Sequence, residues 1–190
     1  MHLDPTTKSA SLGKDLRALR RARGLTLSDA ATSLDRSVGW LSQVERDLSS
    51  PSVADLQALA QLLDVPMSIL FGASSGPSEE AGIIVRKNAR RTIPRPVEGL
   101  YEELLSPDLT DDFEMVHSTF EPGSHVTESV LRPTQEVAVM LEGRLDLVID
   151  GWEATVGPGD SFRLRGVPFT WSNPYAEAAV AIWVIAPPVY

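Results

Sequence analysis

The chain has 190 residues, and 43% of them are hydrophobic, which is enough for one sizeable core or two small ones. It contains no cysteine, so disulfide bonds and thiolate metal ligands are excluded. The stretch from Met1 to Ser11 is polar and lacks the apolar core of a signal peptide, and no apolar run approaches the roughly 18 residues of a membrane span. We therefore expect a cytoplasmic protein without a membrane partner.

The net charge of −9 is unevenly distributed along the chain. Between Lys8 and Arg46, eight Lys or Arg stand against four Asp or Glu, whereas from Ala73 onward nine stand against eighteen. This asymmetry indicates a basic working surface in the first part of the chain. The acidic second part would repel nucleic acid and confine any contact to the first.

Composition and hydrophobic period together predict an α + β two-domain protein. Residues 1–11 are expected to be a flexible N-terminus, 12–72 a helical domain, 73–82 a linker, and 83–190 a β domain with its core at 113–186. The linker is small, polar and rich in residues that break regular structure. Across it, the hydrophobic period changes from that of helices to that of strands.

The helical domain is expected to contain five helices. They are predicted at 12–23, 27–34, 37–46 and 52–63, with a last short one from Pro66 onward. Gly24 ends the first helix, Ser37 is a plausible N-cap of the third, and Ser52 belongs to the cap of the fourth.

Residues 27–46 have the proportions of a helix-turn-helix motif. In such motifs the N-terminal part of the second helix meets base edges in the major groove of double-stranded DNA. Side chains expected on this face can bond bases, contact thymine methyls or touch the backbone; they are Ser37, Val38, Trp40, Gln43 and Arg46. Thr26 and Ser28, at the start of the first motif helix, suit phosphates. Trp40 could instead pack in the core, and Arg46 could be a solvated charge.

Four stretches of this domain resemble the phage-repressor (XRE/Cro) class. They are 24–28 (GLTLS), 38–46 (VGWLSQVER), 49–52 (SSPS) and 56–65 (LQALAQLLDV). The resemblance implies a five-helix, lambda-repressor-like domain, and it implies that Arg20 of the first helix pairs with Glu45. Asp35 and Asp47 stand where the family has glycine, and aspartate tolerates the left-handed backbone needed there.

After the linker, short alternating segments are separated by turn residues, a pattern typical of a sandwich or barrel. The expected strands are 113–117, 136–141, 145–149, 152–156, 162–164, 169–172 and 178–186. Turn and spacing motifs in this region resemble those of the cupin family: 122–123 (PG), Glu136 to Gly143, 157–160 (GPGD), 167–169 (VPF) and 173–174 (NP). The resemblance implies a small double-sheet jelly-roll barrel with a central pocket.

The metal ligands of metal-binding cupins are mostly absent from this chain. The positions of the three family histidines fall on Val130, Arg132 and Phe169, so only Glu136 remains. One carboxylate does not hold a transition metal, and an added arginine repels it. We therefore expect no metal and no cofactor; the alternative is a displaced site that uses His125 with Glu136.

Arg132, Glu136 and Phe169 are the predicted ligand-binding residues of the pocket. The guanidinium of Arg132 can clamp a carboxylate or phosphate through two hydrogen bonds. The alternative is an Arg132–Glu136 salt bridge that fills an unused pocket.

These observations predict a sequence-specific transcriptional regulator, expected to repress, whose cupin domain senses a small anionic metabolite. A homodimer would bind an inverted-repeat operator. Two alternatives belong to other classes. A metal-dependent oxygenase or epoxidase would need the missing histidines, and a protein-binding scaffold would co-purify with a partner.

Overall fold

The computed structural model describes residues 12–71, 80 and 82–188. The predicted flexible N-terminus, and most of the predicted linker, lie outside the described residues. The described chain divides into two compact units. A helical unit comprises residues 12–91 as far as described, with Pro107–Thr110, and a β unit comprises Thr92–Ser106 with 111–188.

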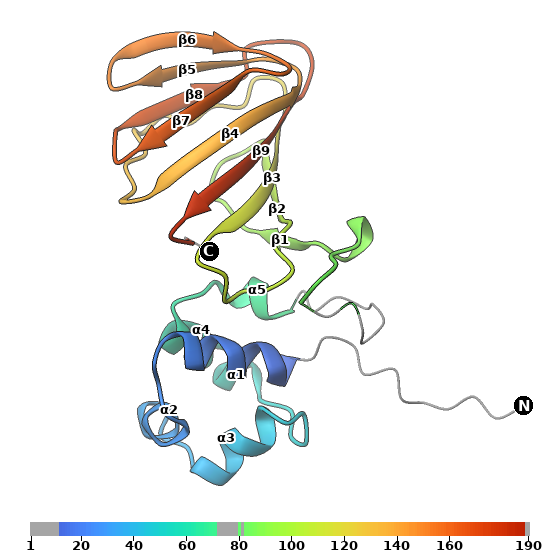
Figure 1. The fold of residues 1–190 in the computed structure, drawn as a ribbon, viewed down its shortest axis with the longest axis vertical. Helices are drawn as coiled ribbons and strands as arrows, with labels where there is room; N and C mark the ends of the chain where they lie inside the picture. The colour runs from blue at the N-terminus through green and yellow to red at the C-terminus, as the bar shows by residue number, and fades with distance from the viewer. Residues whose placement is uncertain (1–11, 72–79, 81, 189–190) are drawn as a thin grey trace, which may run out of the picture. The chain divides into compact units, whose positions relative to one another are not determined.

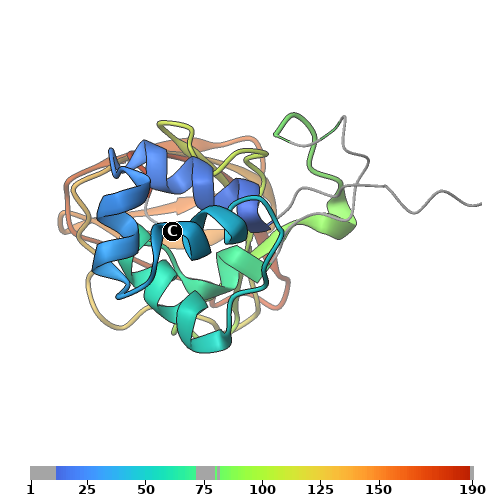
Figure 2. The same ribbon diagram turned by 90° about the horizontal axis from the view of Figure 1, so that it is seen from below.

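The helical unit begins with four helices, followed by a shorter fifth segment (Figures 1 and 2). They are α1 (Leu12–Ala22), α2 (Leu27–Ser33), α3 (Val38–Val44), α4 (Val53–Leu63) and α5 (Met67–Phe71). The starts and ends of α1 to α4 agree with the sequence prediction to within two residues. The last segment has only five residues, little more than one helical turn.

Local hydrogen bonds explain where the helices begin. Thr26 and Ser52 form capping boxes at the starts of α2 and α4, with Asp29 and Asp55 as their partners. The Ser37 hydroxyl accepts a hydrogen bond from the Trp40 amide at the start of α3. The apolar faces of the helices then meet in one core, which includes Leu16, Leu19, Leu41, Leu59, Leu63 and Ile69.

Two aspartates occupy left-handed positions of the backbone. Asp35, between α2 and α3, has φ 52°, and Asp47, after α3, has φ 56°. The sequence prediction that aspartate would adopt this conformation is therefore confirmed. The Asp47 carboxylate accepts a hydrogen bond from the Gly13 amide at 2.9 Å. Gly13 packs so closely that a β-carbon there would lie 2.4 Å from the Val44 carbonyl oxygen.

The β unit consists of two antiparallel sheets (Figure 1). One has the strand order β1-β2-β3-β9-β4-β7, and the other has the order β6-β5-β8. The bounds are β1 (Arg91–Ile93), β2 (Leu100–Leu104), β3 (Glu114–Phe120), β4 (Gln135–Glu142), β5 (Leu145–Ile149), β6 (Trp152–Val156), β7 (Ser161–Arg165), β8 (Phe169–Ser172) and β9 (Ala179–Ala186). Seven of these strands match the predicted ones, whereas β1 and β2 were not predicted.

Side chains alternate between the interior and the outer surface along the central strands. In β3 every second residue from Glu114 to Phe120 is buried, and in β4 the buried positions are Glu136, Ala138 and Met140. This alternation is what a sheet with one covered face requires. Among the described residues, no helix has the length and apolar character needed to cross a membrane.

Candidate DNA-binding helix and enclosed pocket

The helix α3 has one buried face and one exposed face. Leu41 and Val44 are buried in the core of the helical unit, whereas Val38 and Gln43 are exposed. Leu34, the C-cap residue of α2, is only half-buried. A helix whose N-terminal half is solvent-exposed and whose C-terminal half is anchored has the form needed to enter a groove of DNA.

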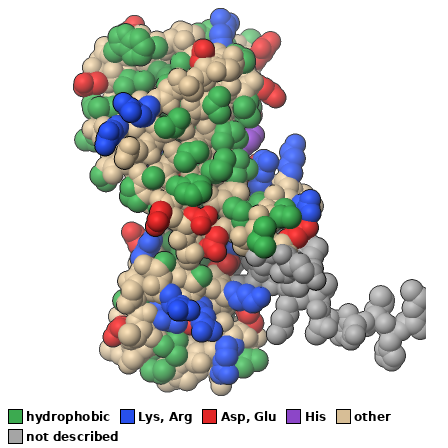
Figure 3. All heavy atoms as spheres, viewed as in Figure 1, with side chains coloured by type: hydrophobic (Ala, Val, Ile, Leu, Met, Phe, Trp, Pro, Cys, Tyr) green, Lys and Arg blue, Asp and Glu red, His purple; other side chains and the backbone are tan. Residues whose placement is uncertain are grey.

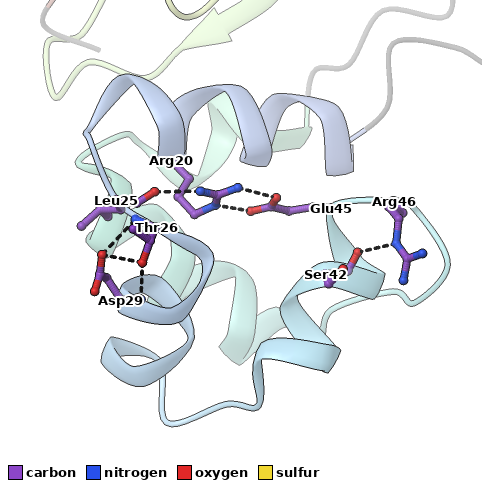
Figure 4. A network of polar contacts seen from close by, with 7 residues as sticks. All are labelled: Arg20, Leu25, Thr26, Asp29, Ser42, Glu45 and Arg46. Carbon is purple, nitrogen blue, oxygen red and sulfur yellow. Dashed lines mark hydrogen bonds and ion pairs between the residues drawn. The ribbon is translucent and has the colours of Figure 1, made fainter.

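Arg20 fixes the C-terminal end of α3 to α1 (Figure 4). Its Nε donates to Glu45 Oε1 at 2.6 Å and its Nη2 donates to Glu45 Oε2 at 2.9 Å, while Nη1 donates to the Leu25 carbonyl at 2.7 Å. The hydrogen bond to Glu45 raises the pKa of Arg20. This two-point contact confirms the pairing that the family resemblance implied, and it sets the direction of α3.

Thr26 serves the N-terminus of α2. Its hydroxyl donates to Asp29 Oδ2 at 2.6 Å and accepts from the Asp29 amide at 3.1 Å. These hydrogen bonds lower the pKa of Asp29. Because its proton is already donated, the Thr26 hydroxyl would have to leave Asp29 before it could donate to a phosphate. Ser28 lies exposed in the first turn of the same helix.

Trp40 is half-buried beneath Arg36, a residue that the sequence analysis did not select. The guanidinium carbon of Arg36 lies 5.5 Å from the Trp40 ring centroid. Arg36 also forms an ion pair with Asp55 at 2.8 Å. Arg36 therefore covers the Trp40 ring while it is held by Asp55 of α4, which favours a supporting role of Trp40 over free access to bases.

Arg46 follows α3 and is exposed. Its Nε donates to the Ser42 carbonyl at 3.0 Å (Figure 4), and the rest of its guanidinium makes no contact within the described part of the chain. Figure 3 shows further Lys and Arg side chains, drawn in blue, on the viewed side of the helical unit. Ser37, Val38, Trp40 and Gln43 thus lie at the start of α3 or within it, Arg46 follows its end, and Thr26 and Ser28 lie at the start of α2.

The β unit contains a cavity of about 990 Å³. Arg132, Glu136 and Phe169 all line it, so the structure brings the three predicted pocket residues together. Phe169 is buried, and its backbone pairs with Val130 in an isolated bridge. This volume lies within the usual range for small-molecule sites.

The polar groups at the cavity floor are only partly satisfied. Arg132 Nη1 lies 3.8 Å from Glu136 Oε1, which is too long for a hydrogen bond. The same Oε1 accepts a hydrogen bond from the Thr134 hydroxyl at 2.7 Å. Trp183, another cavity residue, has a buried indole nitrogen without a hydrogen-bond partner. No motif in the sequence indicated a polar role for Thr134 or Trp183.

Aromatic rings form much of the cavity wall. Phe120 and Trp171 meet edge to face with their centroids 4.7 Å apart, and both line the cavity. His125 lines it too, but its Nδ1 lies 3.1 Å from the Gly123 carbonyl. Among the described residues, no group of three or more His, Asp or Glu side chains is placed to hold a metal ion.

Both units match known domain families. A helix-turn-helix domain model matches residues 11–68, and a cupin domain model matches residues 116–185. The chain therefore combines an XRE-type helix-turn-helix domain with a C-terminal cupin domain. The place of Arg20 and Glu45 in this XRE–cupin protein agrees with the family pattern.

Two curated relatives align with most of this chain, and a third aligns with about a third of it. The XRE–cupin chain is 27% identical over 165 residues to the HTH-type transcriptional regulator PuuR of Escherichia coli, covering 85% of this chain and 86% of the relative. It is 27% identical over 159 residues to the HTH-type transcriptional regulator SutR of Escherichia coli, covering 80% of each. The transcriptional regulator ClgR of Mycobacterium tuberculosis is 36% identical over 60 residues, covering 32% of this chain and 54% of the relative.

Proposed function

We propose that this XRE–cupin protein is a sequence-specific DNA-binding transcriptional regulator. In this proposal it represses from an inverted-repeat operator, as a homodimer, and a small anionic ligand in the cupin pocket controls it. The observation that carries the proposal is the exposed N-terminal half of α3, which the Arg20–Glu45 contact anchors at its other end. Its relatives PuuR and SutR, both HTH-type transcriptional regulators, support the same class.

The side chains around α3 suit base recognition. Gln43 is exposed, and its amide can form two hydrogen bonds with adenine. Val38, also exposed, can contact a thymine methyl group. Arg46 has donors left over for the phosphate backbone. Ser28 and the amides at the start of α2 would hold the neighbouring phosphates.

The small size of one DNA-binding head supports a homodimer, because a single head makes too few contacts for specific binding in cells. The β unit offers a surface for pairing with a second copy. On the outer face of the large sheet, Val137 pairs with Val184 and Val139 with Ile182. The valines among them, with Leu141, are 36–49% exposed. Contiguous exposed apolar surface of this kind marks interaction sites.

The cupin pocket would control DNA binding through the relative arrangement of the two heads. A ligand shifts such an equilibrium only if it binds one arrangement better than the other. Arg132 is the charged group that a small anion would meet, because it lines the cavity and lacks hydrogen bonds within the described residues.

The test of the proposal is selection of bound duplexes from a random DNA pool by the full chain. We expect an inverted repeat whose half-sites are spaced by about one helical turn. The Gln43→Ala variant, selected in parallel, should lose preference at one base pair of each half-site. If the duplexes bound at moderate salt show no enriched sequence, the proposal is contradicted.

A further inference from the structure

The charges that line the cupin cavity differ between its floor and its mouth. We use floor for three lining residues of low exposure: Glu136 and Trp183, which are buried, and Arg132, which is partly exposed. At the mouth stand Glu98, Glu121 and Glu128, which are all exposed and line the same cavity. A ligand that spans the cavity therefore meets two different electrostatic environments.

The floor offers hydrogen-bond donors that the protein itself does not use. The Arg132 guanidinium forms no hydrogen bond within the described residues, and its only ion pair is the 3.8 Å contact with Glu136. Trp183 is 7% exposed, and its indole N–H has no partner. An indole nitrogen can only donate, so this group needs an acceptor, and a carboxylate is an acceptor that also suits Arg132.

The mouth carries uncompensated negative charge. Of the other charged residues that line the cavity, Arg95 and Glu102 neutralise each other in an ion pair, and Ser118 donates to Glu102 at 2.8 Å. None of the three mouth glutamates forms an ion pair within the part of the chain that the structure describes. An anion alone would be repelled there, whereas a cationic group would be attracted.

From these observations we infer that the pocket takes a zwitterionic ligand: an amino carboxylate whose carboxylate meets Arg132 and Trp183 and whose ammonium group lies toward Glu98, Glu121 and Glu128. This rests on the proposed function and revises its ligand: the group that meets Arg132 is still an anionic carboxylate, but the whole molecule also carries a cationic group. The aromatic walls of Phe120 and Trp171 cover the apolar part between the two charged ends. The cavity of about 990 Å³ has ample room for such a molecule.

The inference is tested by isothermal titration calorimetry on the full chain with three probes of equal chain length. The probes are 6-aminohexanoate, hexanoate and hexylamine. We expect 6-aminohexanoate to bind at least about tenfold more tightly than either singly charged probe, because each charged end contributes separately.

Three variants separate the two ends of the ligand. Arg132→Gln should weaken 6-aminohexanoate and hexanoate but not hexylamine. Trp183→Phe keeps an aromatic ring, loses the N–H, and should weaken the same two probes by a smaller factor. The triple change Glu98→Gln, Glu121→Gln, Glu128→Gln should weaken 6-aminohexanoate and hexylamine while hexanoate binds as well or better. Glu153→Gln, exposed on β6 and outside the cavity, is the matched control.

Binding of the selected duplex is measured on the same preparations, and circular dichroism confirms that each variant is folded. The inference is overturned if hexanoate or hexylamine alone binds as tightly as 6-aminohexanoate, or if none of the three releases heat. If the selected duplex still binds normally when the ligand inference fails, the proposed DNA-binding function is unaffected. Loss of duplex selectivity with the expected calorimetry would instead contradict the proposed function alone.

Discussion

Arg20 and Glu45 join the first helix to the end of the recognition helix by two parallel hydrogen bonds, of 2.6 and 2.9 Å, between side chains that are almost fully buried. The two residues are 25 positions apart in the chain. Such a contact fixes both the distance and the angle between two helices, because the planar guanidinium and carboxylate groups must face each other.

Removing one member of this pair should destabilise the helical unit strongly. Arg20→Ala leaves the Glu45 carboxylate buried without its partner, and we expect a loss of about 3–5 kcal/mol in the free energy of unfolding. Urea unfolding followed by circular dichroism at the helix signal measures it. Arg17→Ala, exposed on the same helix, is the control and should change stability by less than about 0.5 kcal/mol. A loss for Arg20→Ala as small as that of the control would show that the pair does not anchor α3.

Gln43 should determine the preference at one base pair. Gln43→Ala removes a side chain that can bond one base, so we expect relaxed preference at a single position of each half-site at a cost of about 1–3 kcal/mol. Competition binding with singly substituted duplexes measures this cost. Gln57→Ala, exposed on α4, provides a control glutamine in the same unit. Uniform weakening across all duplexes would indicate that Gln43 touches only the DNA backbone.

The capping box of α4 should make the helical unit sensitive to acid. Hydrogen bonds, chiefly from Ser52, lower the pKa of Asp55 below its ordinary value of 3.8. A carboxyl group whose pKa is lower in the folded state stabilises the fold above its ordinary pKa, and this contribution is lost as the pH falls through the folded pKa. The melting temperature of the helical unit should therefore drop as the pH falls below about 4.

In Asp55→Asn the side chain cannot ionise, so its melting temperature should start a few degrees lower and change less with acid. Thermal melts between pH 7 and pH 2.5 measure the difference. Asp64→Asn is the control, because the Asp64 side chain makes no hydrogen bond within the described chain and asparagine also tolerates its left-handed backbone. Equal acid sensitivity of Asp55→Asn and the wild type would contradict this explanation.

The outer face of β4 and β9 should hold two copies of the chain together. Val139→Glu places a charge among Val137, Ile182 and Val184, so we expect monomers in analytical ultracentrifugation. Affinity for an inverted repeat should then fall by roughly a hundredfold or more, because the two heads no longer bind as a linked pair. Val148→Glu, exposed on β5 of the other sheet, should leave the dimer intact. Dimers that persist in Val139→Glu would place the pairing surface elsewhere.

The helices were predictable because their signals are local. Thr26, Ser37 and Ser52 each cap a helix within three residues of chain, and the glycine-to-aspartate changes at 35 and 47 could be judged from backbone preference alone. The strand β2 was missed because its sequence, Leu-Tyr-Glu-Glu-Leu, does not alternate cleanly. It is set by its pairing with β3, the next strand along the chain, which the pattern within β2 itself does not encode.

Residues of the candidate sites were predictable where a sequence motif gives their position, but the contacts between them were not. Arg132, Glu136 and Phe169 could be placed because the cupin spacing carries their positions. The stacking of Arg36 over Trp40 and the unpartnered Trp183 N–H depend on which side chains meet in three dimensions. Their residue types alone give no sign of these contacts, since arginine and tryptophan occur in many surface and core positions.

The close packing of Gly13 against the end of α3 limits which residues this position tolerates. The carbonyl of Val44 occupies the space that a side chain at Gly13 would need, and the Asp47 carboxylate accepts a hydrogen bond from the Gly13 amide. Val44 is the last residue of α3 and Asp47 follows it, so Gly13 contacts the C-terminal end of that helix. Any larger residue at this remote position would push that helix out of alignment. If α3 reads DNA as proposed, a single methyl group at Gly13 should alter the sequence preference without contacting DNA, and screens for altered specificity should include this position.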